Sequence, residues 1–187
     1  CEEPLKAMPH TPENVENNSE VSHQTTFEKH KAERWERYLQ AVKQLRGKDA
    51  SARVSGVHAL VVLVDEWLHE ENLSEDEKIK EGQFIINKLC VYVSSPFTLA
   101  SEYDELTQDS PTAEGLYKNR EQEFYIHKAE FRAEADVRLS IMEEIHARLQ
   151  GPDENTPGAW SDFEYDFSGS IFFYPVDLTR SYYTKPV

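Results

Sequence analysis

Two Glu-x-x-His pairs in this 187-residue sequence have the spacing that carboxylate-bridged di-metal sites use. They are Glu66 with His69 and Glu143 with His146. In such sites each pair projects from one helix of a bundle, and single glutamates on two other helices complete the ligand set. A metal-binding helical bundle is therefore the most specific chemistry that the residue spacing suggests.

Helical periodicity argues against this metal hypothesis, because the ligands must point into the bundle. Glu66 and His69 fall away from the apolar stripe of their own segment, and His146 is about a quarter turn from the apolar position beside it. A third pair, Glu20 with His23, lies in a polar stretch, which indicates that the spacing arises by chance. The sequence therefore predicts neither a bound metal nor another cofactor.

Other catalytic signatures are missing from the sequence. It contains no Gly-rich phosphate loop, no Gly-x-Ser-x-Gly elbow and no cysteine in a suitable histidine context. His58 lies in an apolar segment and is predicted to be a hydrogen-bonded core imidazole. Acidic runs such as "SEDEK" are typical of solvated helix faces. We expect a protein without enzymatic activity.

The composition is acidic, with 35 Asp and Glu against 20 Lys and Arg and a formal net charge of −15. A surface for nucleic acid or an anionic membrane would need clustered lysines and arginines. The longest strongly apolar run, residues 59–64, is far shorter than the roughly 20 residues that span a bilayer. The sequence predicts a soluble cytoplasmic protein that binds a basic or polar protein partner and no nucleic acid.

The two cysteines, Cys1 and Cys90, provide neither a disulfide framework nor a Cys-x-x-Cys metal motif. Cys90 lies in an apolar run and is predicted to be a small core residue. Cys1 precedes a polar stretch, as the lipidated cysteine of a secreted lipoprotein does. The start of a cloned fragment, or a cleavage site, would also explain a cysteine at position 1. An extracellular lipoprotein is therefore kept as the alternative to a cytoplasmic protein.

The elements that would carry these residues are four long helices that follow a flexible lead-in. The lead-in, residues 1–24, is rich in polar residues and has no periodic apolar face. Residues 25–151 form the predicted helical domain, because apolar residues recur there at spacings of three and four. The four helices are expected at residues 26–47, 50–71, 74–96 and 118–150.

A long loop is predicted between the third and fourth helices, at residues 98–117. Loops of this length inside a compact domain are usually functional or flexible. Aromatic residues in and beside the loop could line a partner-binding surface, although a contribution to the core fits the pattern equally well. These candidates are Phe97, Tyr103, Tyr117 and Tyr125.

Two stretches of the sequence repeat a pattern. "ARVSGV" and "VRLSIM" each join an arginine, Arg53 or Arg138, to the start of an apolar segment, with an aspartate a few positions before. Stacked helical hairpins of the HEAT and armadillo kind use such helix starts. Two short copies also arise by chance, so a HEAT-like bundle and two unrelated amphipathic helices both remain open.

The chain resembles the helical region of actinobacterial pentapeptide-repeat-containing proteins in "RWERYLQAVKQLRGKDASARVSGVHALVVLVDEW", "KLCVYVSSPF", "AEADVRLSIMEEIHARLQ" and "WSDFEYDFSGSIFF". The resemblance covers residues 33–178 and keeps the order of these motifs. It departs from the family pattern at Ser55 and His58, where Gly and Tyr are usual, and in the insertion at 98–117. It implies a HEAT-like helical region that hydrophobic segments outside this sequence would tether to a membrane.

The resemblance also bears on the C-terminal segment, residues 152–187. Pentapeptide repeats form a right-handed β-helix with Leu or Phe pointing inward at every fifth residue. Here Phe167 and Phe172 are five apart, and Leu178 follows six residues later. We expect a truncated β-helix-like coil that packs its Phe residues on the last helix, with an irregular β-hairpin as the alternative.

Together these observations predict a mainly α protein, a HEAT- or armadillo-like bundle of about four long helices with a short C-terminal β-helix-like coil. The predicted function is a non-catalytic protein-interaction or scaffold module. The alternatives are a metal-binding bundle of the di-metal carboxylate type and a secreted lipoprotein. Any membrane association would run through segments outside this sequence.

Overall fold

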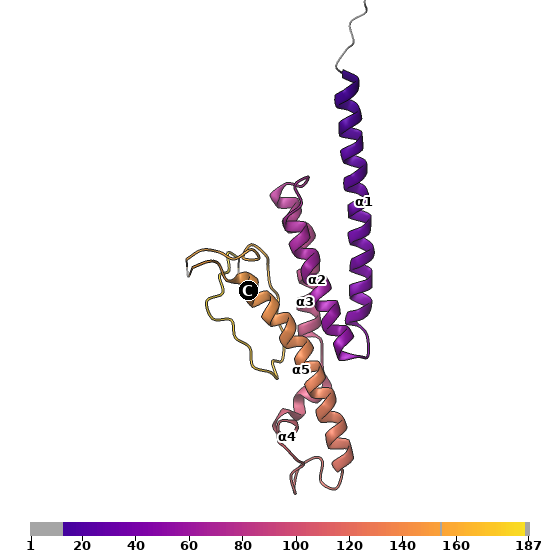
Figure 1. Cartoon of the computed structure of the whole chain (residues 1–187). Helices are drawn as coiled ribbons and strands as arrows, with labels where there is room; N and C mark the ends of the chain where they lie inside the picture. The colour runs from indigo at the N-terminus through magenta and orange to yellow at the C-terminus, as the bar shows by residue number, and fades with distance from the viewer. Residues whose placement is uncertain (1–12, 154, 186–187) are drawn as a thin grey trace, which may run out of the picture. The chain divides into compact units, whose positions relative to one another are not determined.

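The computed structural model describes residues 13–153 and 155–185, with side chains from Thr25 onward. The chain divides into two units, Cys1–Arg37 and Tyr38–Val187. The described part is mainly helical, as predicted (Figure 1). Its long helices are α1 (Glu13–Leu45), α2 (Ala50–Leu68), α3 (Glu75–Ser94) and α5 (Glu121–Leu149), and the short elements η1 (Thr98–Glu102) and α4 (Tyr103–Leu106) precede α5.

Helix α1 begins at Glu13, thirteen residues before the predicted start at residue 26. The predicted irregular lead-in is therefore helical over residues 13–24. These residues include no Gly or Pro, so extending an existing helix through them costs little per residue even without an apolar stripe. The remainder of the lead-in, residues 1–12, lies outside the described residues.

The end of α1 belongs to the second unit and packs on α2. Tyr38, Ala41 and Leu45 are buried at spacings of three and four. A Cβ atom added to Gly56 of α2 would lie 2.8 Å from both Ala41 O and Leu45 N, so the missing side chain lets the two backbones approach closely. The neighbouring Leu39 is exposed, because only the edge of the helix that carries Tyr38, Ala41 and Leu45 is buried.

Helices α2, α3 and α5 pack against one another to form the core of the second unit. Helix α2 is apolar around most of its circumference and lies centrally, as its composition predicted. Cys90 of α3 is buried, and burial raises the pKa of its thiol to about 11. The buried residues of α2 are Gly56, Val57, Leu60, Val61, Leu63, Val64 and Trp67.

Side chains fix where α2 and α3 begin. The Asp49 carboxylate accepts hydrogen bonds from the backbone N–H groups of Ser51, at 2.7 Å, and Ala52, at 3.2 Å. Ser74 and Glu77 form a capping box, in which each side chain accepts a hydrogen bond from the other residue's backbone N–H. These caps satisfy N–H groups that a helix start would otherwise leave without partners.

The predicted loop at 98–117 contains the short helical elements η1 and α4. Leu99 and Leu106 are buried there, and their burial anchors these two elements on the core. Tyr117 is also buried, and its hydroxyl donates to Glu102 and lies 2.7 Å from His127 Nδ1. The insertion is therefore tied to α5 instead of forming one irregular loop.

The C-terminal segment contains no strand among residues 155–185, and the β-helix-like coil is not seen in this part of the structure. An isolated bridge joins Gln150 to Pro157. Phe172, expected to point inward, is 44% exposed. Several aromatic residues of the segment instead pack into the hydrophobic core of the helices. Those that are buried are Trp160, Phe163, Tyr165, Phe173 and Tyr174.

A buried ion pair joins the helices of the second unit. Glu134 of α5 accepts hydrogen bonds from Arg138 Nε and Arg53 Nη1, both at 2.8 Å, and from the Tyr92 hydroxyl at 3.1 Å. Arg53 and Arg138 are the two arginines of the repeated sequence pattern. They meet on one carboxylate, which connects α2, α3 and α5.

Arg138 also binds the end of α3 and the C-terminal segment. It donates to Val93 O at 2.7 Å and to Ser95 O at 2.8 Å, two carbonyls at the end of α3. Its guanidinium carbon lies 5.3 Å from the centre of the Phe173 ring. The guanidinium of Arg138 therefore donates to carbonyls at the end of α3, pairs with the Glu134 carboxylate and lies against the Phe173 ring.

Replacing Glu134 should destabilise the second unit strongly. Glu134→Ala leaves Arg138 buried without its carboxylate, which typically costs about 3–5 kcal/mol of the free energy of unfolding. The exposed Glu130→Ala, one turn earlier on α5, should change this free energy by less than about 0.5 kcal/mol. Urea unfolding followed by Trp fluorescence measures both. Equal effects of the two substitutions would show that the ion pair does not hold the helices together.

Candidate functional site

The C-terminal segment is fixed to α5 by a second polar cluster. Arg148 of α5 donates to both carboxylate oxygens of Asp65 on α2, at 2.8 to 3.1 Å. Trp160 Nε1 donates to the same carboxylate at 2.8 Å, and the Arg148 guanidinium carbon lies 4.9 Å from the centre of the Trp160 ring. These contacts therefore fix the direction in which the C-terminal segment continues from the end of α5.

Backbone hydrogen bonds bring the segment back to the same helix end. Tyr182 N donates to Leu149 O at 3.2 Å, and Thr184 N donates to Ser161 O at 3.0 Å. Figure 1 shows the C-terminal segment as loops beside the last turns of α5. The segment and α5 thus form two sides of a seam that runs along the C-terminal half of the helix.

A groove lies in this seam, which we call the α5–tail groove. It has a volume of about 310 Å³ and is lined by Leu139, Met142, Glu143, His146, Pro175 and Asp177. Apolar side chains and two carboxylates therefore share one cavity. The groove combines surface for an alkyl chain with a negative charge at its border.

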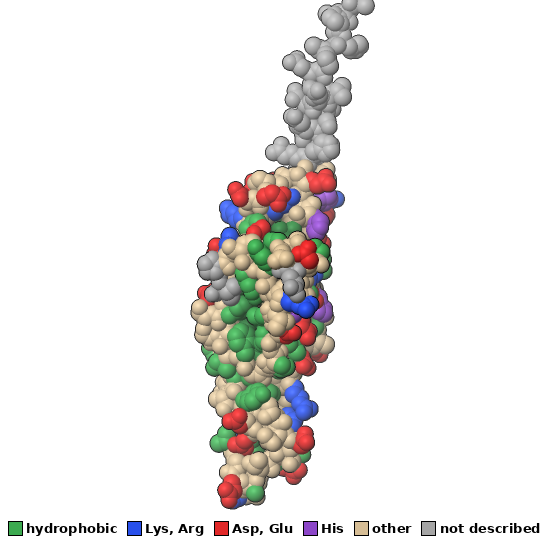
Figure 2. Space-filling view, turned by 90° about the vertical axis from the view of Figure 1, so that its left-hand side faces the viewer, with side chains coloured by type: hydrophobic (Ala, Val, Ile, Leu, Met, Phe, Trp, Pro, Cys, Tyr) green, Lys and Arg blue, Asp and Glu red, His purple; other side chains and the backbone are tan. Residues whose placement is uncertain are grey.

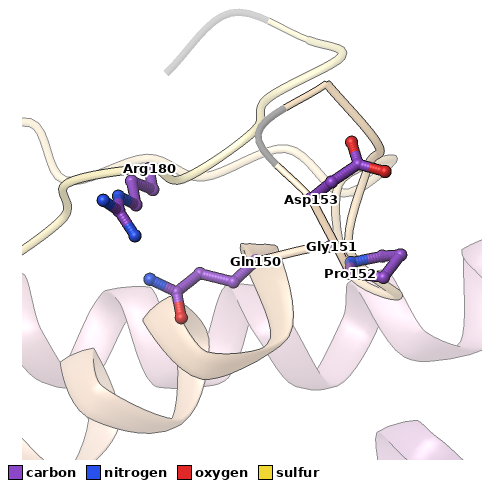
Figure 3. A pocket seen from close by; sticks show the side chains of 5 residues that line it. All are labelled: Gln150, Gly151, Pro152, Asp153 and Arg180. Atoms are coloured by element: carbon purple, nitrogen blue, oxygen red, sulfur yellow. The ribbon is translucent and has the colours of Figure 1, made fainter.

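A smaller pocket of about 160 Å³ lies further along the seam (Figure 3). Its lining residues are Gln150, Gly151, Pro152, Asp153 and Arg180. The α5–tail groove carries acidic charge, whereas this pocket includes a guanidinium as well as a carboxylate. We call it the Arg180 pocket.

Hydrogen bonds to one carbonyl separate the two cavities. In the tautomer with the proton on Nε2, His146 donates to Thr179 O, which lies 2.8 Å away; Gln150 Nε2 lies 2.9 Å from the same ring nitrogen. Gln150 Nε2 also donates to Thr179 O at 3.4 Å. Both donors come from α5 and the acceptor from the C-terminal segment. The bridge therefore fixes the width of the seam between the groove and the pocket.

Two aspartates of the seam, Asp177 and Asp153, have a lowered pKa. Hydrogen bonds from the backbone N–H and hydroxyl of Thr179, with the nearby His146, lower the pKa of Asp177 below its usual value. In the Arg180 pocket, hydrogen bonds from Asn155 N and the Thr156 hydroxyl lower the pKa of Asp153. Both carboxylates therefore accept hydrogen bonds from residues of their own loops.

The structure distributes the predicted metal ligands between two places. Glu143 and His146 line the α5–tail groove together with Asp177. Glu66 and His69 lie at the end of α2, where His69 Nδ1 is 2.6 Å from Asp65 O. Among the side chains that the structure describes, from Thr25 onward, no group of three or more His, Cys, Asp or Glu could hold a metal ion.

The predicted partner-binding aromatics also separate. Tyr103 and Tyr125 are exposed, whereas Tyr117 is buried and Phe97 stacks on Phe173 with ring centres 5.2 Å apart. Phe97 and Tyr117 therefore contribute to packing. None of the four lines the α5–tail groove.

Sequence reasoning missed Asp177 and Arg180. "VDLTR" carries a local signal, because Asp177 accepts a hydrogen bond from Thr179 N at 2.8 Å, the Asx turn that Asp-x-Thr favours. That signal predicts a turn and does not predict its position against α5.

His58 differs from its prediction as a core imidazole. The side chain is exposed on α2, and its Nε2 lies 3.5 Å from Glu144 Oε1. Its immediate sequence neighbours are apolar, but position 58 falls on the outer edge of the helix.

Comparison with protein-family models, curated proteins and solved structures gives no significant match for this chain. The resemblance to pentapeptide-repeat proteins and the HEAT-like stacking therefore stay predictions. None of the described helices combines the length and hydrophobicity needed to cross a bilayer.

Removing the Tyr174 hydroxyl should alter how stability depends on pH. Burial is the main cause that raises the pKa of Tyr174 to about 12; the nearby Arg138 acts against it and Glu134 in the same direction. An unfolded phenol ionises near pH 10. The unfolded state therefore releases a proton between about pH 10 and 12 that the folded state keeps, and the free energy of unfolding falls as the pH rises.

Tyr174→Phe should lessen this fall, because the phenylalanine has no proton to release. The burial-raised pKa of Tyr92, about 12, leaves part of the slope in place. At pH 7 the variant should retain its stability within about 1 kcal/mol, since the Tyr174 hydroxyl has no hydrogen-bond partner in the described part of the chain. Urea unfolding from pH 8 to 11.5 checks this, and equal slopes for both proteins would contradict it.

Proposed function

We propose that the second unit is a non-catalytic protein-interaction module that binds a basic segment of a partner protein in the α5–tail groove. The observation that carries the proposal is the lining of this groove, where apolar side chains adjoin Glu143 and Asp177. Lysine and arginine side chains have a matching division into an apolar stem and a cationic head. The groove therefore fits the side chain of a basic residue.

The size of the groove supports a peptide side chain as the ligand. Pockets for drug-sized small molecules and cofactors typically have volumes of about 300–1,000 Å³. At about 310 Å³, the α5–tail groove lies at the low end of this range. One or two side chains of a partner would fill it, with the rest of the partner lying along the seam.

The C-terminal segment that lines the groove also carries exposed apolar residues. Ile171 is 62% exposed and Phe172 44% exposed, and both precede Pro175 in the C-terminal segment. Figure 2 shows hydrophobic side chains gathered across the middle of the face that carries this segment. Exposed apolar patches beside polar residues commonly mark protein-binding surfaces.

The overall charge supports the same kind of partner. A net charge of −15 attracts a basic segment from a distance and raises its association rate. Electrostatic attraction of this kind does not by itself select a sequence. The apolar lining of the groove would supply the short-range selection.

The proposal includes the architecture that the sequence resemblance implies. A HEAT-like helical region would serve as a scaffold, and segments outside this sequence would tether it to a membrane. What supports the scaffold role is the set of four long helices with a fixed C-terminal segment. The proposed partner surface does not depend on the tether.

Selection of peptides by the purified chain tests this function. In a random decapeptide display library, the wild-type protein should enrich Lys or Arg next to apolar residues. Glu143→Gln with Asp177→Asn should abolish this preference and weaken a selected peptide by about two- to thirtyfold, because each of the two exposed charge pairs contributes about 0.2–1 kcal/mol. Asn at 177 keeps an oxygen that can accept from Thr179 N.

The matched control is Glu121→Gln with Glu130→Gln. It removes the same charge from exposed positions near the start of α5 and should bind selected peptides as the wild type does. Fluorescence anisotropy gives the dissociation constants. Selection of no basic residue, or equal weakening by both double variants, would contradict the proposed function.

A further inference from the structure

We infer that the partner segment carries an aromatic residue at the second position before or after its basic residue, and that this aromatic side chain packs on Phe172. The inference rests on the proposed function, because it extends the same site beyond one end of the α5–tail groove. It adds a residue type and a position in the partner that the acidic groove alone would not require.

The path of the chain places Phe172 at one end of the groove. Phe173, the next residue, is buried, and its ring centre lies 5.3 Å from the guanidinium carbon of Arg138. Leu139, which follows Arg138 on α5, already lines the groove, and Pro175 lines it from the C-terminal segment. Phe172 and Pro175 are three residues apart, which spans at most about 10 Å of extended chain. Phe172 therefore adjoins the Leu139 end of the groove.

Neighbouring rings fix the orientation of the Phe172 ring. It makes edge-to-face contacts with the ring of Tyr174, at 5.9 Å between centres, and with the ring of Phe167, at 6.3 Å. Tyr174 is itself buried, whereas Phe172 remains 44% exposed. A side chain that is already held in place loses little conformational freedom when a ligand packs on it. The open part of the ring is therefore a preorganised surface for another aromatic side chain.

The charges of the groove decide which residue accompanies the aromatic one. The Glu143 carboxylate has no hydrogen-bond or ion-pair partner among the described residues. Asp177 accepts a hydrogen bond from Thr179 N, and a carboxylate has about four acceptor sites, so Asp177 can also accept from a ligand. A second copy of this chain would bring a net charge of −15 against these carboxylates. The basic segment of a different protein is therefore the occupant that the charges favour.

The spacing of the two partner residues follows from the length of α5 along the groove. Phe173 marks the position of Arg138, and Glu143 follows Arg138 by five residues, which is about 7.5 Å of helix. In an extended peptide, side chains two residues apart point to the same face and lie about 6.5–7 Å apart. A basic residue at Glu143 therefore places the second residue along the peptide at Phe172. The third residue along would point away from the protein.

Six-residue peptides with one aromatic and one basic residue test this pattern. The probes Gly-Phe-Ala-Arg-Ala-Gly and Gly-Ala-Arg-Ala-Phe-Gly carry it in both chain directions. One comparison peptide, Gly-Ala-Ala-Arg-Ala-Gly, lacks the aromatic residue. Two others, Gly-Phe-Ala-Ala-Arg-Gly and Gly-Arg-Ala-Ala-Phe-Gly, move it one position further away. Fluorescein-labelled peptides and fluorescence anisotropy give the dissociation constants for the whole chain.

One of the two probes should bind the wild-type protein about two- to tenfold more tightly than the comparison peptides, which is the range that an added aromatic pair provides. Phe172→Ala should remove this advantage. Comparing both peptides on both proteins isolates the contact between the two rings, because effects on the basic residue alone cancel. Equal binding of all peptides that contain Arg would overturn the inference.

Two further variants guard against a change in the fold. Phe172→Leu keeps an apolar side chain against Tyr174, so it should reduce the advantage without changing the affinity for the peptide that lacks Phe. Ile126→Ala removes an exposed apolar side chain from the first half of α5 and should keep the full advantage. An advantage that persists in both Phe172 variants, or that Ile126→Ala removes as well, would contradict the assignment of Phe172.

Sedimentation velocity of the chain without peptide tests the other occupant. At the concentrations used for binding, the chain should show no association that depends on Phe172. A dimer that Phe172→Ala abolishes would show that a second copy covers this ring, and would overturn the inference.

The same peptides separate this inference from the proposed function. Gly-Ala-Ala-Gln-Ala-Gly, which carries Gln in place of Arg, shows whether the basic residue is bound at all. If Gly-Ala-Ala-Arg-Ala-Gly binds more tightly than this neutral peptide, the proposed function stands whatever the aromatic probes show. If it binds no more tightly, the proposed function fails as well.

Discussion

The buried carboxylate of Glu134 is the interaction on which the second unit depends. Charges taken from water are costly unless partners surround them, and Glu134 is matched by Arg53, Arg138 and the Tyr92 hydroxyl. The same Arg138 binds carbonyls at the end of α3 and lies on the Phe173 ring. The ion pairs of Glu134 with Arg53 and Arg138 therefore connect three helices and the C-terminal segment.

The α5–tail groove follows from two points at which the C-terminal segment is fixed to α5. Phe173 packs at Arg138, and Trp160 packs at Arg148. These arginines are ten residues apart, which is about 15 Å of helix. The groove lies on α5 between these two arginines. Its width therefore depends on Arg138 and Arg148, against which Phe173 and Trp160 pack. This arrangement relates the structural ion pairs to the proposed binding surface.

Helix positions could be predicted from the sequence because they follow from local spacing, whereas contacts between distant segments could not. Arg53 and Arg138 repeat a visible pattern, but Glu134 resembles any other acidic residue of an exposed helix face. Its burial depends on the packing of three helices. Likewise, the turn at Asp177 has a local signal, while its position beside Glu143 depends on how the whole segment folds back.

The central claim is that residues 160–184 are fixed on α5, since both proposed binding sites require it. Hydrogen–deuterium exchange of the intact chain tests it most directly, through the backbone N–H groups of Trp160, Tyr182 and Thr184. Each donates to a backbone carbonyl, of Arg148, Leu149 and Ser161 respectively, so all three should exchange as slowly as N–H groups inside α5. Rapid exchange at all three, alongside a protected α5, would contradict the account.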